Sequence, residues 1–162
     1  PGTGGFSDVK RGDWYAPYVA FAKRYGIANG YLDGTFRPEQ PVSRAELVKL
    51  IASYFTVEGG TSPFPDVPDG HWAAEVVSFA AEEGWVSGYP DGTFRPDAPV
   101  SRAEAVKILN HALDRRAGER AAALPFTDVE KGHWACDEIR EAAVSHIYRK
   151  SGEGETWLTY ER

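Results

Sequence analysis

The chain has 162 residues, of which 42% are hydrophobic and 13% aromatic, so it can form a hydrophobic core in one domain or in a few small repeated units. Its formal net charge of −6 disfavours nucleic-acid binding, and an anionic ligand would have to be held by a few well-placed cations. The single cysteine, Cys136, excludes an intramolecular disulfide and a cysteine-based zinc site within the chain, and no apolar run of about 18 residues indicates a membrane span.

An internal repeat organises the sequence. A shift of about 58 residues aligns the segment 6–55 with 64–113 without a gap, and such a period indicates a repeat architecture. A third copy begins near Phe126 and loses the pattern towards its end. We therefore expect three units, over residues 1–60, 61–118 and 119–162, the last of them truncated or degenerate.

Each complete repeat is predicted to fold as helix, loop, helix. In the first helix of repeat 1, Trp14, Tyr18 and Phe21 have the i, i+4, i+7 spacing of one apolar face. Gly26 lies where the C-terminus of a helix favours a left-handed residue. Aromatic residues that recur at fixed spacing usually fill the same position in each repeat. The expected core therefore comprises Phe6, Val9, Trp14, Phe36 and their counterparts.

The loop between the two helices carries the turn sequence Asp-Gly-Thr-Phe, at Asp33 and again at Asp91. One aspartate is too few for a calcium loop, which needs several oxygen ligands at alternate positions. His111 and His146 have no partner at metal-ligand spacing, so we predict neither a metal site nor a cofactor.

The second helix is predicted to begin at Ser43 and, in repeat 2, at Ser101. Each serine stands three residues before a glutamate, which is the spacing of a capping box, so we assign Glu46 and Glu104 as helix caps. The expected buried stripe of this helix comprises Leu47, Leu50 and Ile51, and in repeat 2 Ala105, Ile108 and Leu109.

Capping does not explain the arginines that follow the two serines. Arg44 and Arg102 occupy the first turn, where the helix dipole disfavours a cation by about 0.3–1 kcal/mol. A guanidinium beside free backbone N–H groups and a hydroxyl suits a carboxylate or phosphate ligand. A salt bridge to an acidic residue of the neighbouring repeat explains it equally well, and the residues alone leave both interpretations open.

The order of motifs resembles the S-layer homology (SLH) family. The motifs are Phe-x-Asp-Val, His-Trp-Ala, Gly-Tyr-x-Asp-Gly-Thr-Phe-Arg-Pro and Ser-Arg-Ala-Glu, matched in full in repeats 1 and 2 and in the first half of repeat 3. The resemblance implies a mostly α fold of tandem helix-loop-helix repeats, arranged as a pseudo-threefold spindle whose third repeat is incomplete here.

The resemblance also implies a function. SLH modules anchor proteins outside the cell, at the bacterial cell wall or S-layer, by binding secondary cell-wall polysaccharide, often through a pyruvate ketal on a sugar. The anionic glycan lies in grooves between repeats, with the arginine central. Carried over to this sequence, the ligand-binding residues are Arg44 and Arg102, with Ser43 and Ser101 beside them and Gly30 and Gly88 allowing close approach.

The third repeat departs from the family pattern. Tyr160 falls at the arginine position and Arg162 at the glutamate position, so a third equivalent groove is not expected. The second helix of this repeat is also missing. Either the chain continues beyond Arg162, or another chain or a rearranged element supplies the helix, which leaves an oligomer or a helix exchange open.

Two other functions compete with glycan binding. The alternative to glycan binding is a structural or protein-interaction module of the S-layer or envelope, in which the arginines only join the repeats. Glycan cleavage by Glu46 and Glu104 is disfavoured, because the two are equivalent copies, whereas a general acid and a general base need environments that differ. We therefore expect a non-catalytic protein.

Overall fold

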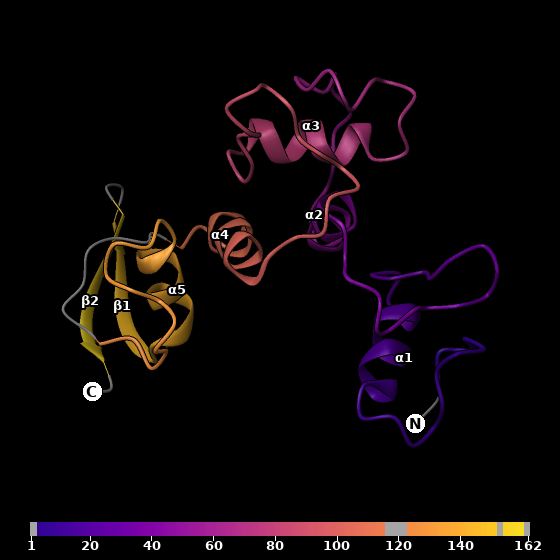
Figure 1. Ribbon diagram of the computed structural model, residues 1–162, viewed down its shortest axis with the longest axis horizontal. Coiled ribbons are helices and arrows are strands. Elements are labelled where there is room, and N and C mark those ends of the chain that lie inside the picture. The colour runs from indigo at the N-terminus through magenta and orange to yellow at the C-terminus, as the bar shows by residue number, and fades with distance from the viewer. Residues whose placement is uncertain (1–2, 116–122, 152–153, 161–162) are drawn as a thin grey trace.

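A computed structural model of the protein describes residues 3–115, 123–151 and 154–160. The described chain runs from α1 at one end to a two-stranded hairpin at the other, with α2, α3 and α4 between them (Figure 1). The prediction of a mostly helical fold is confirmed, and none of these helices has the length and apolar content needed to cross a bilayer. The elements are α1 (Ala16–Arg24), α2 (Arg44–Ala52), α3 (Ala74–Glu82), α4 (Arg102–Ala112), α5 (Cys136–Ala143), β1 (His146–Ser151) and β2 (Gly154–Tyr160).

The first helix of each complete repeat ends at a glycine, as the sequence predicts. Gly26 follows α1 with φ of 71°, and Gly84 follows α3 with φ of 72°. These values lie in the left-handed region, which glycine adopts without steric cost. At the other end of α1, Pro17 occupies the first turn, where a backbone N–H has no partner within the helix.

The second helices, α2 and α4, both begin with a capping box. The Ser43 hydroxyl accepts from the Glu46 N–H at 3.2 Å, and Glu46 Oε2 accepts from the Ser43 N–H at 2.8 Å. Ser101 and Glu104 form the same two bonds at the start of α4. The orientation of each glutamate is thus fixed at a helix N-terminus.

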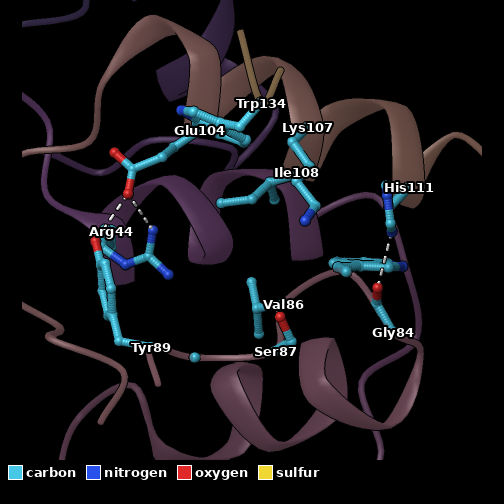
Figure 2. A pocket seen from close by; sticks show the side chains of 12 residues that line it. Arg44, Gly84, Val86, Ser87, Tyr89, Glu104, Lys107, Ile108, His111 and Trp134 are labelled. Atoms are coloured by element: carbon cyan, nitrogen blue, oxygen red, sulfur yellow. Dashed lines mark hydrogen bonds and ion pairs between the residues drawn. The ribbon is translucent and has the colours of Figure 1, made fainter. Parts of the chain in front are cut away.

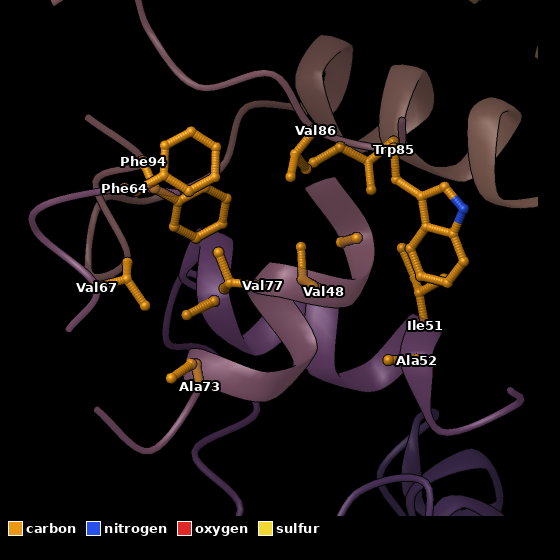
Figure 3. Close-up of a cluster of buried hydrophobic side chains, with 14 of the residues drawn as sticks. Val48, Ile51, Ala52, Phe64, Val67, Ala73, Val77, Trp85, Val86 and Phe94 are labelled. Carbon is orange, nitrogen blue, oxygen red and sulfur yellow. The ribbon is translucent and has the colours of Figure 1, made fainter. Parts of the chain in front are cut away.

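The larger hydrophobic core lies where α3 packs on α2 (Figure 3). Val48 of α2, Val77 of α3 and Phe94 of the following loop are fully buried there, and the Phe94 ring lies 5.4 Å from that of Phe64. A smaller core in repeat 1 contains Phe6, Val9, Ala16 and Val19.

The predicted buried stripe of the second helices was wrong in part. Ile51 and Ile108 are buried, but Leu47 and Leu50 are only half-buried and Leu109 is exposed. The buried face is turned towards smaller residues, which let the neighbouring helix approach closely. In α2 this face comprises Ala45, Val48, Ile51 and Ala52.

The prediction that the recurring tryptophans belong to the core was also wrong. Trp14, Trp72 and Trp134 expose 80%, 53% and 60% of their surface. Each stands just before the start of a first helix, outside the turns that pack inward. Lys49 Nζ lies 5.2 Å from the centre of the Trp72 ring, and Lys107 Nζ lies 6.0 Å from that of Trp134, so two of the indoles contact a cation.

Each loop between helices is held by an aspartate from the start of the repeat. Asp8 accepts the N–H groups of Phe36 and Arg37 at 2.8 and 2.7 Å, and Asp66 accepts those of Phe94 and Arg95 at 2.9 and 2.7 Å. Both arginines have φ of 58°, a left-handed conformation that is strained for a residue with a side chain. The aspartates offset this strain.

In the third repeat a β-hairpin stands where the second helix would be. α5 packs on α4, and β1 and β2 then pair antiparallel, with a register shift between Ile147 and Tyr148. Sequence reasoning did not foresee these strands. Residues 116–122, which contain the predicted boundary between repeats 2 and 3, and Arg162 lie outside the described residues. The pseudo-threefold arrangement stays a prediction.

The two phenylalanines at equivalent loop positions provide a test of the core. Phe94→Ala should lower the free energy of unfolding by about 3–5 kcal/mol, because it leaves a cavity at a fully buried site. Phe36→Ala, at the half-buried counterpart in repeat 1, should cost distinctly less. Urea denaturation of both variants measures the difference, and equal losses would contradict the larger core in repeat 2.

The turn aspartates predict a loss of stability in acid. Bonds from Thr35 and Arg37 lower the pKa of Asp33 to about 2, and the equivalent bonds from Thr93 and Arg95 lower the pKa of Asp91. A folded-state pKa below the unfolded value stabilises the fold above the unfolded pKa, and this contribution is lost as pH falls from about 4 towards 2. The melting temperature should therefore fall over that range.

The double variant Asp33→Asn, Asp91→Asn should flatten this dependence on pH. The control is Asp97→Asn, since Asp97 is exposed and forms no such bond in the described part of the chain. A pH profile unchanged by the double variant would argue against these turns as its origin.

Candidate functional site

A hollow of about 300 Å³ lies at the junction of the repeats (Figure 2). Repeat 1 contributes Arg44, at the start of α2, and repeat 3 contributes Trp134. Repeat 2 supplies the rest of the lining from the loop after α3 and from α4. These residues are Gly84, Trp85, Val86, Ser87, Gly88, Tyr89, Glu104, Lys107, Ile108 and His111.

Arg44 connects repeat 1 to repeat 2. Its Nε donates to the Phe94 carbonyl at 3.0 Å, and its Nη1 donates to Glu104 Oε1 at 3.0 Å. The guanidinium lies 4.8 Å from the centre of the Tyr89 ring and 5.0 Å from that of Phe94, and only 6% of the residue is exposed. The sequence left two interpretations of this arginine open. One of them, a salt bridge to a neighbouring repeat, is therefore present at Arg44.

This salt bridge leaves donors on Arg44 unused. A guanidinium carries five N–H groups, and the two bonds above use one each on Nε and Nη1. No bond from Nη2 is found within the described part of the chain, and Nη2 is not among its fully buried unbonded atoms. Arg44 can thus pair with Glu104 and still donate to a second anion in the hollow.

Glu104 is the acceptor on which these contacts converge. Its Oε2 accepts from Ser101 in the capping box, while its Oε1 accepts from both Arg44 and the Tyr89 hydroxyl, the latter at 2.8 Å. Burial raises the pKa of Glu104, but the bonds from Ser101 and Tyr89 and the charge of Arg44 outweigh it, so the pKa lies below its usual value. Glu104 is therefore ionised at neutral pH.

The far end of the hollow carries a residue without a counterpart in repeat 1. His111 lies opposite Arg44 (Figure 2), with Nδ1 3.0 Å from the Gly84 carbonyl and Nε2 3.3 Å from Glu138 Oε1 of α5. Ser53 takes its place in repeat 1. Arg44 and Lys107 give the hollow two cationic side chains against one carboxylate, in a chain of net charge −6.

Arg102, the second predicted arginine, lies elsewhere. It is exposed and does not line the hollow, and its side chain forms no hydrogen bond or ion pair in the described ranges. In the alignment of the repeats, the tyrosine–glutamate pair that Arg102 would contact falls in repeat 3. The structure has the hairpin there instead. The two arginines, identical in local sequence, therefore have different surroundings.

Repeat 1 contains half of an equivalent site. The Tyr31 hydroxyl donates to Glu46 Oε1 at 2.6 Å, as Tyr89 does to Glu104. No arginine forms an ion pair with Glu46 in the described part of the chain, although the Arg37 guanidinium lies 3.9 Å from the centre of the Tyr31 ring.

The predicted glycines Gly30 and Gly88 have an internal role. Their φ values are 72° and 69°, and a β-carbon at Gly88 would lie 2.5 Å from the Phe64 ring; one at Gly30 would meet the Phe6 ring in the same way. Packing of the phenylalanine thus requires glycine at both positions. Gly88 also lines the hollow, whereas Ser43 and Ser101 are not part of its lining.

Sequence reasoning missed most of the lining of the hollow. Tyr89 carried a signal, because it aligns with Tyr31, but it was not assigned a role. Trp134 was placed in the core and His111 was set aside as isolated. Their proximity to Arg44 depends on contacts between repeats, which no local pattern encodes.

A second cluster of polar residues lies between α5 and the hairpin. Arg115 donates to Glu141 of α5, and its Nε donates to Glu155 Oε2 of β2 at 3.4 Å. His146 Nε2 lies 3.1 Å from Glu141 Oε1, and its ring stacks on Trp157 at 3.7 Å. The ligand atoms of Glu141, His146 and Glu155 lie within 4.8 Å of one another, contrary to the prediction that His146 is isolated. Arg115 contacts all three, so the cluster is an ion-pair network that holds the hairpin on α5.

Comparison with known proteins agrees with these repeats. Residues 5–48 and 63–106 each match the S-layer homology domain, which together is more than half of the chain. The cellulosome-anchoring protein of Acetivibrio thermocellus is 35% identical over 93% of this chain and 35% of its own length. Cell surface glycoprotein 1 of the same organism is 34% identical over 94% of this chain and 7% of its own length.

An S-layer protein of Bacillus licheniformis is 40% identical over 65% of this chain and 13% of its own length. The chain thus spans about a third or less of each of these relatives. The matched residues include both Ser-Arg-Ala-Glu segments. The chain belongs to the S-layer homology domain family and is located at the bacterial cell surface.

Proposed function

We propose that this chain is a non-catalytic anchoring module that binds an anionic, pyruvylated cell-wall polysaccharide in the hollow beside Arg44. The observation that carries this proposal is the position of the guanidinium. It is fixed by Glu104 and Phe94 and retains unused N–H donors at the edge of a hollow between repeats.

The chemistry of the lining suits such a ligand. A pyruvate ketal presents a carboxylate, which accepts charge-assisted hydrogen bonds from the remaining N–H groups of Arg44. Lys107 adds a second positive charge, and the exposed indole of Trp134 offers a flat apolar surface to a sugar ring. Burial of Arg44 fixes it before the ligand arrives, which reduces the entropy lost on binding.

Anchoring follows from the same proposal. The relatives include a cellulosome-anchoring protein and an S-layer protein, and the chain corresponds to a minor part of each. A module that holds wall polysaccharide would attach whatever domain is joined to it.

A structural module is the second candidate. The Arg44–Glu104 pair favours it, because this ion pair joins two repeats without any ligand. Arg44→Ala cannot distinguish the two functions alone: breaking a partly buried pair costs on the order of 2 kcal/mol of stability in either case.

The distinguishing variants are Trp134→Ala and Lys107→Ala, which leave the Arg44–Glu104 pair intact. Each should lower the affinity for pyruvylated wall polysaccharide about tenfold, because the indole and the ammonium line the hollow and take no part in the Arg44–Glu104 pair. Arg44→Ala should lower it about a hundredfold. Co-sedimentation with purified walls measures the affinity, before and after chemical removal of pyruvate.

The indole–ammonium pair of Trp72 and Lys49 supplies the matched controls. Trp72→Ala and Lys49→Ala change this equivalent pair, which does not line the hollow, and should alter binding less than twofold. Arg102→Ala should also leave binding unchanged. Equal affinity of the Trp134 and Lys107 variants and the parent chain would reject glycan binding in this hollow and favour the structural module.

A further inference from the structure

The loop that follows α1 contains an Asn-Gly pair, at Asn29 and Gly30. The side-chain amide carbon of an asparagine can be attacked by the backbone nitrogen of the next residue, which closes a five-membered succinimide ring. Glycine as the next residue leaves this attack unhindered, because it has no β-carbon. The chain has one other asparagine, Asn110, and it is followed by His111. Asn29 is thus the asparagine whose neighbour favours ring closure.

Both reacting groups of the pair are free in the folded chain. The Asn29 residue is exposed, and within the described residues neither its side-chain amide nor the Gly30 N–H forms a hydrogen bond. Asn110, by contrast, is 4% exposed within α4, and its Nδ2 donates to the main-chain carbonyl and the carboxylate of Glu138 at 3.0 and 2.7 Å. The fold therefore holds one asparagine in place and leaves the other able to react.

A lysine near the end of α1 activates the attacking nitrogen. Lys23 Nζ donates to the main-chain carbonyl of Asn29 at 2.9 Å. This carbonyl and the Gly30 N–H belong to the same peptide group, so the ammonium stabilises the negative charge that develops when the N–H loses its proton. Because the deprotonated nitrogen is the nucleophile, the cation increases the rate of attack.

The exposure of Asn29 does not depend on what packs on repeat 1. Repeat 2 has the aligned pair Ser87 and Gly88, with φ of 69° at Gly88 against 72° at Gly30. Repeat 1 packs on repeat 2 through α2, and Ser87 is nevertheless exposed in the lining of the hollow. A helix that covered repeat 1 in the same manner would therefore leave Asn29 accessible to water. The serine side chain has no amide, so repeat 2 lacks the reactive pair.

We propose that Asn29 is a site of spontaneous deamidation promoted by Lys23. Gly30 N attacks Asn29 Cγ, the bond from Cγ to Nδ2 breaks, and the proton lost by Gly30 leaves with Nδ2 in ammonia. Water then opens the succinimide at one of its two carbonyls and gives aspartate or isoaspartate. The reaction needs no enzyme, water is its co-reactant, and it does not depend on glycan binding.

The isoaspartate product changes the smaller core. It places one more carbon atom in the main chain before Gly30, which packs so closely on Phe6 that a β-carbon there would lie 2.2 Å from the ring. Phe6 belongs to the core of repeat 1. The next residue, Tyr31, donates from its N–H to the Thr35 carbonyl at 2.8 Å. The longer main chain must shift these contacts, so repeat 1 loses stability while repeat 2 does not.

Peptide mapping by mass spectrometry of the full chain, incubated in its folded state at neutral pH, tests the proposal. The peptide that contains Asn29 should gain the mass of an amide-to-acid exchange at least tenfold faster than the peptide that contains Asn110, and isoaspartate should be among the products. The rate should rise with pH, because hydroxide removes the Gly30 proton. Asn29→Ser, which introduces the residue of repeat 2, should abolish the reaction.

Two further comparisons separate the steps. Lys23→Met should slow the conversion at least threefold, whereas Lys10→Met, at an exposed lysine that does not bond to Asn29, should leave it unchanged. Asn29→Asp reproduces the charge of the product without the longer main chain, so its melting temperature should stay near that of the parent. The parent chain after incubation should melt at a lower temperature, in proportion to its isoaspartate content.

Three outcomes contradict the proposal. Equal rates at Asn29 and Asn110 would show that the fold protects both asparagines. A rate that rises in proportion to the unfolded fraction in urea would assign the reaction to the unfolded chain. Conversion that Lys23→Met leaves unchanged would overturn the part assigned to the lysine.

Discussion

The junction between repeats 1 and 2 depends on one buried guanidinium. Arg44 stands at the first position of α2, where the helix dipole opposes a cation, and it is almost fully removed from water. Such a charge is tolerated only when it is paired. Glu104 supplies the opposite charge from the N-terminus of α4, where the dipole favours a carboxylate. The unfavourable position of the arginine is thereby offset by the favourable position of the glutamate.

Glu104 can pair with the guanidinium because the capping box already fixes the orientation of its carboxylate. One oxygen of Glu104 closes the capping box with Ser101, and the other remains for Arg44 and Tyr89. Because the local helix signal and the contact between repeats use the same carboxylate, the orientation of α4 and the position of the guanidinium cannot vary independently. The lining of the hollow therefore includes a cation whose place is set before any ligand binds, which is the property that an anion site requires.

The sequence predicts well those features that depend on interactions within a few residues. The capping serines, the glycines that end α1 and α3, and the turn at Asp33 all follow from local rules, and the structure has them in place. The exposure of Trp134 and the β-hairpin could not be obtained in this way. The indole lies outside the helix that it precedes, and the hairpin is held by Arg115, which reaches α5 from the end of α4. Both depend on neighbours that are distant in sequence.

The contrast between Arg44 and Arg102 shows why counting motifs overestimates the number of arginine–glutamate pairs between repeats. Both arginines are the second residue of a Ser-Arg-Ala-Glu segment that starts a helix, and their immediate neighbours in the chain are identical. Arg44 meets a tyrosine–glutamate pair because an intact repeat follows it, whereas Arg102 is followed by a repeat that ends in a hairpin. The arginine–tyrosine–glutamate cluster thus belongs to a junction between two intact repeats and not to a single repeat. Two intact repeats in series form one such junction, and within the described residues Glu46 has no arginine in an ion pair and Arg102 has no carboxylate.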